Sequence, residues 1–328
     1  MKIAVTGGAG FLGGNLVRAL LERGDTVRVL VREDRRGIDS LSVEELAGDV
    51  RNLEDLQACF EGVDAVFHCA AVVSIQGSLG GLVESINIRG VENVVQACLD
   101  QKVKKLVHFS SVHALDPRPQ DQSITEERAL CDSDDMHHPA YARSKANGER
   151  AILEGVARGL DACILNPSGM IGPWDFKPSP LGEALVQMHR RSLPGLVNGG
   201  YNWVDVRDVV ASALQALEKG VAGERYLVTG HSTSVRELAE AAQEVTGKRP
   251  PWMTSPLWLA RLSAPIMEGW ANLWGKPPIY TRESIQVLGD NDDFVCQKAS
   301  EVLGHDPRPL VDTLRDTYAW FESEGMVE

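Results

Sequence analysis

The sequence predicts an α/β fold in which a doubly wound parallel sheet carries a smaller, mainly helical C-terminal lobe. Short apolar strands alternate with amphipathic helices through the first half of the 328 residues. This alternation is typical of a parallel sheet whose two faces are covered by helices. A glycine-rich turn follows the first strand, and the regular alternation ends near Asn166.

The apolar runs predict six strands, at Lys2–Thr6, Thr26–Val31, Leu46–Ala47, Ala65–His68, Lys105–Ser110 and Asp161–Asn166. The amphipathic stretches between them predict helices near Asn15–Arg23, Asn52–Phe60, Ile86–Gln101 and Pro139–Gly159. Proline, glycine and tryptophan then accumulate between residues 167 and 203. A helix over Val206–Lys219 and a strand over Glu224–Val228 follow, and we expect this strand to return to the main sheet.

The composition narrows the possible partners. A formal net charge of −13 argues against a nucleic-acid surface, which needs clustered Lys and Arg to neutralise phosphates. The six cysteines are scattered without metal-ligand spacing, as expected of reduced thiols in a cytoplasmic protein. The chain opens with a strand instead of a signal peptide, and no apolar run is long enough to span a bilayer.

One segment, from Trp252 to Trp274, has a membrane-like composition with four tryptophans and few charges. A helix lying on a membrane would carry Lys and Arg on its polar face. Only Arg261 and Glu268 are charged in this segment. We therefore expect a place in the core or in a lid over the substrate, and no membrane contact.

The glycine-rich turn after the first strand reads Gly7-Gly8-Ala9-Gly10-Phe11-Leu12-Gly13. Gly7 permits a tight turn, Gly10 lets the backbone approach a pyrophosphate, and Gly13 lets the next helix pack closely on the strand. The N–H groups and the positive dipole end of that helix then point at the phosphates. The turn, with Phe11 and Leu12 inside it, therefore predicts a dinucleotide site on a Rossmann-type sheet.

Tyr141 and Lys145 lie four residues apart on the helix expected near Pro139–Gly159, so both occupy one face. A phenol with a pKa near 10 is a poor acid–base catalyst at neutral pH, and a neighbouring ammonium is expected to lower that pKa. Ser110 and Ser111 end the preceding strand, where a hydroxyl faces the ligand crevice of such a sheet.

The glycine spacing and the later Tyr-x-x-x-Lys resemble the extended branch of the short-chain dehydrogenase/reductase superfamily, over almost the whole chain. The nearest resemblance is to members like dihydroflavonol-4-reductase and 3β-hydroxysteroid dehydrogenase. It implies a triad in which Ser111 binds the substrate oxygen, Tyr141 transfers a proton, and Lys145 tunes Tyr141 and holds the nicotinamide ribose. It also implies a homodimer formed through the helices near 86–101 and 139–159.

Further cofactor contacts follow from the same resemblance. Asp49 and Val50 match the pair that brackets the adenine, and Asn87 matches an asparagine whose role is either structural or catalytic. Small residues under the cofactor and at its nicotinamide end correspond to Ala70, Ala71, Pro167 and Ser168. The resemblance further implies two interleaved domains, with dinucleotide binding in residues 1–166 and 205–230 and substrate binding in residues 167–204 and 231–328.

The second strand indicates which nicotinamide cofactor is used. NAD enzymes usually end this strand with Asp or Glu, which binds the ribose hydroxyls. Here Val31 occupies that position and Arg32 follows, with Arg35 and Arg36 nearby. A guanidinium suits a 2′-phosphate, so NADP(H) is preferred and NAD(H) remains possible. A solvated basic turn, partly neutralised by neighbouring acids, is the alternative interpretation.

The expected substrate is an apolar carbonyl compound. Val112 and His113 follow Ser111, where family dehydratases carry Asp-Glu, and the segment Gly199–Asp205 lacks the Arg with which epimerases bind a substrate diphosphate. Apolar and aromatic residues are expected around the pocket, among them Met170, Trp174 and Trp203. These features favour an NADPH-dependent reductase of an aldehyde, a ketone, or a steroid-like or flavonoid-like molecule.

Two other functions stay open. A sugar or sugar-nucleotide epimerase would hold NAD tightly and use it transiently. A non-catalytic dinucleotide sensor is the third possibility, although such proteins often lose the catalytic Tyr or Lys that this chain keeps. His137 and His138 have no third ligand at a recognisable spacing, so no metal site is expected.

Overall fold

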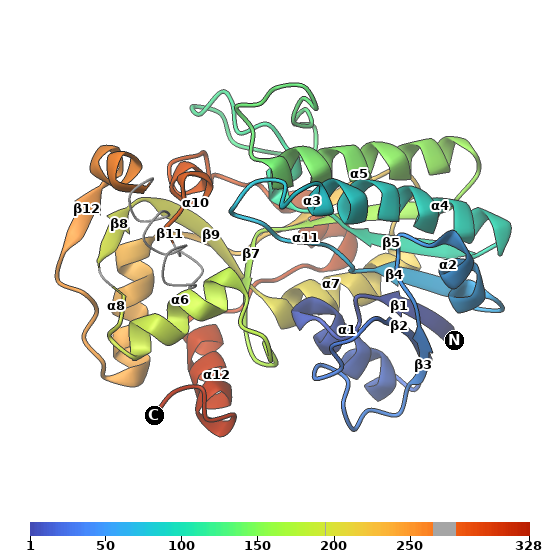
Figure 1. Cartoon of the computed structure of the whole chain (residues 1–328), viewed down its shortest axis with the longest axis horizontal. Coiled ribbons are helices and arrows are strands. Elements are labelled where there is room, and N and C mark those ends of the chain that lie inside the picture. Colours follow the sequence, from blue (N-terminus) through green and yellow to red (C-terminus); the bar gives the residue numbers. More distant parts are fainter. Residues whose placement is uncertain (194, 265–279) are drawn as a thin grey trace.

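A computed structural model describes residues 1–193, 195–264 and 280–328, and its centre is a seven-stranded parallel sheet (Figure 1). The strand order is β10-β6-β5-β4-β1-β2-β3. The strands are β1 (Lys2–Thr6), β2 (Thr26–Val31), β3 (Glu44–Ala47), β4 (Ala65–His68), β5 (Lys105–Phe109), β6 (Ala162–Pro167) and β10 (Arg225–Val228). The order reverses beside β1, and a ligand crevice forms where the carboxyl ends of the strands diverge at such a point.

The last strand of this sheet comes from far along the chain. As expected, the segment near Glu224–Val228 returns to the sheet as β10, which pairs in parallel with β6 and places Tyr226 opposite Leu165. The chain therefore leaves the sheet after β6, builds part of a second lobe, and comes back.

Helices cover both faces of the sheet because alternate strand residues point to opposite sides. On one face, α1 (Phe11–Glu22), α7 (Val206–Lys219) and α11 (Gln297–Leu303) bury one hydrophobic cluster with residues such as Val5. On the other face, α2 (Leu53–Phe60), α4 (Gly90–Asp100) and α5 (Ala140–Ala157) bury a second cluster with residues such as Ala4.

Two helix boundaries differ from the expectation. Helix α1 begins at Phe11 directly after Gly10, its N-cap, and not near Asn15, so Gly13 lies in its first turn. The helix expected over Ile86–Gln101 is preceded by α3 (Leu82–Glu84) and starts with a π-helical turn at Ser85–Arg89 before α4. Such turns are often found at functional sites.

The second lobe contains two small sheets besides its helices. The first sheet has the order β11-β9-β7, from β7 (Gly169–Ile171), β9 (Gly200–Asp205) and β11 (His231–Ser234), and the second pairs β8 (Leu196–Asn198) with β12 (Thr254–Pro256). These strands are only three to six residues long, which leaves little periodicity to recognise. The helices α6 (Pro180–His189), α8 (Val235–Thr246) and α12 (Leu310–Ser323) share a third core with Trp203, and α10 (Arg282–Val287) packs in a smaller cluster.

Helix α11 follows the second-lobe strand β11 in sequence, yet it packs on the main sheet. Ala299 and Leu303 belong to the cluster formed by α1, α7 and the sheet. The range 231–328 expected for the substrate lobe therefore includes one helix whose core contacts are with the dinucleotide-binding sheet.

The tryptophan-rich segment is exposed where it is described. The side chains of Trp252 and Trp258 are 89% and 64% exposed, so the expected core position does not extend to them. Trp270 and Trp274 lie outside the described residues. No helix in the described part of the chain is long and apolar enough to cross a membrane.

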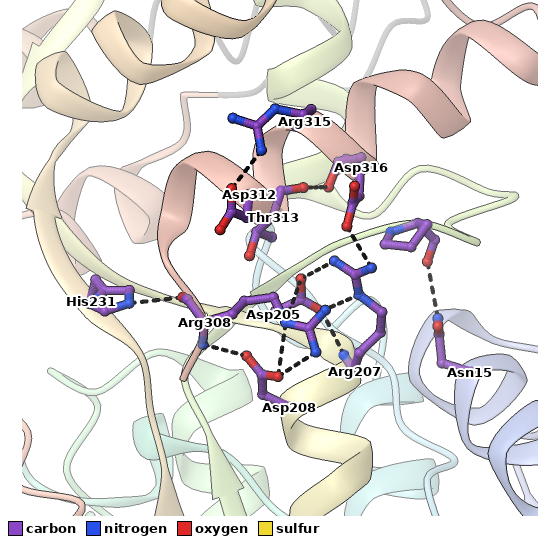
Figure 2. A network of polar contacts seen from close by, with 12 residues as sticks. Asn15, Asp205, Arg207, Asp208, His231, Arg308, Asp312, Thr313, Arg315 and Asp316 are labelled. Carbon is purple, nitrogen blue, oxygen red and sulfur yellow. Dashed lines mark hydrogen bonds and ion pairs between the residues drawn. The ribbon is translucent and has the colours of Figure 1, made fainter. Parts of the chain in front are cut away.

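A buried ionic network joins the two lobes at the start of α7 (Figure 2). The carboxylate of Asp205 caps α7 and pairs with Arg207, which also pairs with Asp316 of α12 at 2.7 Å. The Arg308 side chain pairs with Asp208 at 2.6 Å, and its backbone N–H donates to the same carboxylate. The side chains of Asp205 and Asp208 are 0% and 9% exposed, so both charges depend on these arginines.

We predict that Arg308→Ala lowers the free energy of unfolding by about 1 to 3 kcal/mol, because Asp208 loses its cationic partner while remaining buried. Arg315→Ala is the matched control, since Arg315 pairs with Asp312 at the surface and such pairs contribute little. Urea unfolding followed by tryptophan fluorescence measures both variants. Equal losses in the two variants would contradict a stabilising role for the buried network.

Candidate active site

Two adjoining cavities lie at the carboxyl ends of the strands. The first has a volume of about 330 Å³ and runs from the glycine-rich turn past the end of β2. Eight residues expected to bind the cofactor line it: Gly7, Gly10, Phe11, Arg32, Asp49, Val50, Ala70 and Ala71. The second has a volume of about 430 Å³ and extends from the same turn into the second lobe.

The glycine-rich turn leaves no room for a side chain at Gly7 or at Gly13. Gly7 has a φ of +71°, and a Cβ placed on it would lie 2.6 Å from the backbone nitrogen of Ala70, at the end of β4. A Cβ on Gly13 would lie 2.1 Å from the carbonyl oxygen of Gly7. The close approach of β1, α1 and the end of β4 forms a backbone cradle that fits a dinucleotide pyrophosphate.

The three arginines after β2 differ in their partners. Arg36 holds Asp34 with two of its nitrogens, and this contact lowers the pKa of Asp34 to about 2. Arg35 pairs with Glu45 on β3. The Arg32 side chain lines the first cavity and forms no hydrogen bond or ion pair within residues 1–193, 195–264 and 280–328. Arg32 is therefore the one of the three whose guanidinium is free for a ligand.

The second cavity brings the expected catalytic residues together. Ser111 follows β5, and Tyr141 and Lys145 lie on α5. The lining also includes these residues expected to bind the cofactor or the substrate: Leu12, Gly13, Val112, His113, Pro167, Ser168, Met170 and Trp203. Trp174, expected beside the substrate, lines the first cavity instead, because its ring lies against Arg18 of α1.

Asn87 lines neither cavity and has a structural position inside the π-helical turn. Its side-chain oxygen accepts from the backbone N–H of Val72 at 2.8 Å, and its amide nitrogen donates to the Val72 carbonyl and to Ser144 of α5. These bonds tie the segment after β4 to the helix that carries Tyr141 and Lys145.

Burial controls the protonation of Tyr141. It raises the Tyr141 pKa to about 12, and a hydrogen bond with Ser111 partly opposes this shift. The direction is the reverse of the expected lowering by Lys145. The reason is geometric, because the Lys145 ammonium donates to the Phe109 carbonyl oxygen at 2.7 Å. Tyr141 is thus a protonated donor at neutral pH in this structure.

Lys145 is only 4% exposed, and burial lowers its pKa to about 8. Glu149 lies one helical turn further along α5, and its negative charge opposes that shift. The carboxylate therefore helps to keep the lysine charged inside the protein.

Glu149 also belongs to a buried network that fixes the position of Ser111. The side-chain amide of Asn166 donates to Glu149 at 2.6 Å and to the Ser111 carbonyl at 2.9 Å. Arg225 of β10 pairs with Glu149 at 2.9 Å. The last strand of the sheet is thereby connected to Ser111.

Sequence reasoning missed Glu149 and Tyr201. The spacing of Tyr141, Lys145 and Glu149 at successive turns of one helix face was a usable signal for the first. The hydroxyl of Tyr201 on β9 lies 2.6 Å from Nε2 of His113, and burial lowers the His113 pKa to about 4, so the ring is neutral at physiological pH. The sequence around Tyr201 did not indicate its role, because its partner His113 comes from the other lobe.

The second cavity is poor in positive charge. Among the described residues that line it, Lys145 is the only Lys or Arg, whereas Glu283, Asp290 and Asp292 are acidic. Arg207, which follows β9, is held by Asp205 and Asp316. A substrate diphosphate would thus find no arginine among the described lining residues.

Comparisons with known proteins agree with this geometry. Residues 3–229 match the model of the NAD dependent epimerase/dehydratase family. The chain belongs to this family. It is 33% identical to sterol demethylase protein B of Methylococcus capsulatus over 100% of both chains, and 32% identical to a Synechocystis protein provisionally named dihydroflavonol 4-reductase, over 99% of this chain and 95% of that protein.

A solved structure, that of gox2253, superposes with a TM-score of 0.86 at 32% identity and covers 100% of this chain and 99% of the other. The chain is therefore an enzyme of the NAD(P)-dependent, extended short-chain dehydrogenase/reductase type. A nicotinamide dinucleotide is its cofactor, and the residues around the first cavity fit that molecule.

We predict that Gly10→Ala and Gly13→Ala both weaken NADPH and NADH binding at least about tenfold, but for different reasons. A Cβ on Gly13 would clash with the backbone of Gly7, whereas one on Gly10 would stay 3.3 Å from that carbonyl and meet the ligand. Only Gly13→Ala should therefore also lower the melting temperature. Nicotinamide fluorescence and thermal unfolding measure the two effects, and an equal loss of stability in both variants would contradict this assignment.

Proposed function

We propose that this enzyme is an NADPH-dependent oxidoreductase that interconverts an apolar aldehyde or ketone with the corresponding alcohol. The observation that carries the proposal is the second cavity, which combines Ser111, Tyr141 and Lys145 with a mainly apolar wall, a few acidic residues and no described arginine. A cavity of about 430 Å³ suits a molecule the size of a steroid or a flavonoid. The relatives named for a sterol and for a dihydroflavonol support the same substrate class.

The proposed reduction uses the protein groups as follows. Bound NADPH supplies the hydride. Ser111 hydrogen-bonds the carbonyl oxygen of the substrate, and Tyr141 gives its proton to that oxygen as negative charge develops. Lys145 keeps the site positive when the phenolate forms, which lowers the cost of that proton transfer.

A titration of the purified protein with NADPH and NADH, read by nicotinamide fluorescence, tests the cofactor. Selective binding of NADPH supports the reductase and leads to a panel of aromatic ketones, flavonoid ketones and 3-ketosteroids, assayed by NADPH consumption. If the purified protein retains NAD and acts on UDP-glucose without net consumption of cofactor, it is a sugar-nucleotide epimerase and this proposal is wrong. Cofactor binding with no turnover of either substrate class would favour the non-catalytic sensor.

Tyr141→Phe should reduce turnover of the best ketone by at least about a hundredfold, because the proton donor is lost. NADPH binding should stay within about twofold of the wild type, since the ring remains in place. Tyr280→Phe is the control, because Tyr280 lines the same cavity but donates its hydroxyl to the Gly195 carbonyl. Near-normal turnover by Tyr141→Phe would exclude the proposed triad.

The pH dependence of ketone reduction provides a separate prediction. Reduction needs charged Lys145, so activity should fall as pH rises through the Lys145 pKa. Glu149 raises that pKa, so Glu149→Gln should move the alkaline limb of kcat to lower pH. Glu154→Gln, on an exposed position of the same helix, should leave the limb unchanged. A limb that stays in place in Glu149→Gln would show that Lys145 is not the group that titrates.

We also propose a homodimer formed through α4 and α5, which lie side by side on one face of the sheet (Figure 1). Light scattering after size-exclusion chromatography tests the subunit number.

A further inference from the structure

We propose that the loop 172–179, which joins β7 to α6, completes the NADP(H) site from the second lobe by bringing Lys177 to the 2′-phosphate. We call residues 172–179 the strap loop. Lys177 lines the first cavity together with Arg32, although the two residues come from different lobes. The inference rests on the proposed use of NADP(H), and it adds a second cation to the one expected at the end of β2.

The strap loop contacts the dinucleotide-binding lobe at three points. The side-chain amide of Asn15 on α1 donates to the Pro173 carbonyl at 3.1 Å. The guanidinium carbon of Arg18 lies 4.2 Å from the centre of a Trp174 ring, a cation–π contact. Arg36 donates to the Phe176 carbonyl at 3.2 Å. The loop therefore reaches across from its own lobe to α1 and to the turn after β2.

The conformation of the strap loop is fixed from within its own lobe as well. Trp174 adopts a φ of +72°, which a bulky residue rarely adopts unless its surroundings hold it there. The buried carboxylate of Asp175 accepts the backbone N–H of Ser179 at 2.8 Å. Phe176 packs edge-on against Trp320 of α12, with ring centres 5.2 Å apart. Lys177 follows directly after these fixed residues.

The other cations near the first cavity are already engaged. Arg36 is held by Asp34, and Arg18 donates to the carbonyls of Gly14 and Gly37 besides stacking on Trp174. The Lys177 side chain is exposed and, like that of Arg32, forms no hydrogen bond or ion pair anywhere in the described ranges, although its charge helps to lower the pKa of Asp34. The lining also holds the acids Glu33, Asp34 and Asp49, so that without Lys177 its two arginines would be outnumbered by three negative charges.

The charge of the ligand then determines what Lys177 contributes. A 2′-phosphate carries close to two negative charges, so a single free arginine beside Glu33 does not balance it. A lysine is a flexible point charge that suits phosphate at the mouth of an open cavity. The 2′-hydroxyl of NAD(H) gains little from the same ammonium. Lys177 should therefore affect NADPH and leave NADH unchanged.

The test compares Lys177→Ala with Lys248→Ala, which removes an exposed lysine of the same lobe that lines neither cavity. Each protein is titrated with NADPH and with NADH by nicotinamide fluorescence at low and at high salt. Lys177→Ala should weaken NADPH binding about 3- to 10-fold at low salt and leave NADH unchanged. Lys177→Arg should restore most of the NADPH affinity, and Lys248→Ala should match the wild type.

The wild type tests the proposed cofactor, and the Lys177→Ala variant tests the role of Lys177. A wild type that binds NADPH and NADH equally well would overturn the proposed cofactor and, with it, this inference. The inference alone would be overturned if the wild type prefers NADPH but Lys177→Ala leaves the affinity for both nucleotides unchanged or reduces both equally. The proposed cofactor would then stand. Adenosine 2′-monophosphate serves as a second probe, and its competition with NADPH should weaken in Lys177→Ala.

Discussion

The close contact between Gly13 of α1 and the carbonyl of Gly7 determines the geometry on which the site depends. It allows α1 to lie against the end of β1, where the strand order reverses and the crevice forms. The same helix presents Asn15 and Arg18 to the strap loop. The position of α1 thus determines both the shape of the phosphate cradle and the contacts with the strap loop. A shift of α1 would disturb both.

Burial of charge is the second organising feature. Lys145 and Glu149 lie inside the protein, where an isolated ion is costly, and they are stable there because Arg225 and Asn166 complete the network. The same burial keeps Tyr141 protonated. Tyr141 therefore keeps the proton that the proposed reduction requires.

The fold could be read from the sequence because its signals are local. The apolar runs located every strand of the main sheet, and the glycine spacing located the turn at Gly7–Gly13. Local signals could not place Trp174, whose position depends on Arg18 in another part of the chain. They also could not give the direction of the Tyr141 pKa, because the Lys145 ammonium points to a strand carbonyl and not to the phenol. The short strands of the second lobe were missed for a simpler reason, since three residues do not establish an alternation.

Strand β10 comes late in the sequence, which affects how the chain folds during synthesis. Strand β6 is buried along its whole length, and its outer edge pairs with β10. While the ribosome is still producing residues 168–224, that edge is open to pairing with any other extended chain, which is a known route to aggregation. Glu149 also lacks Arg225 during this interval. The nascent chain thus acquires its sheet edge and the charge balance of its active site in one docking event.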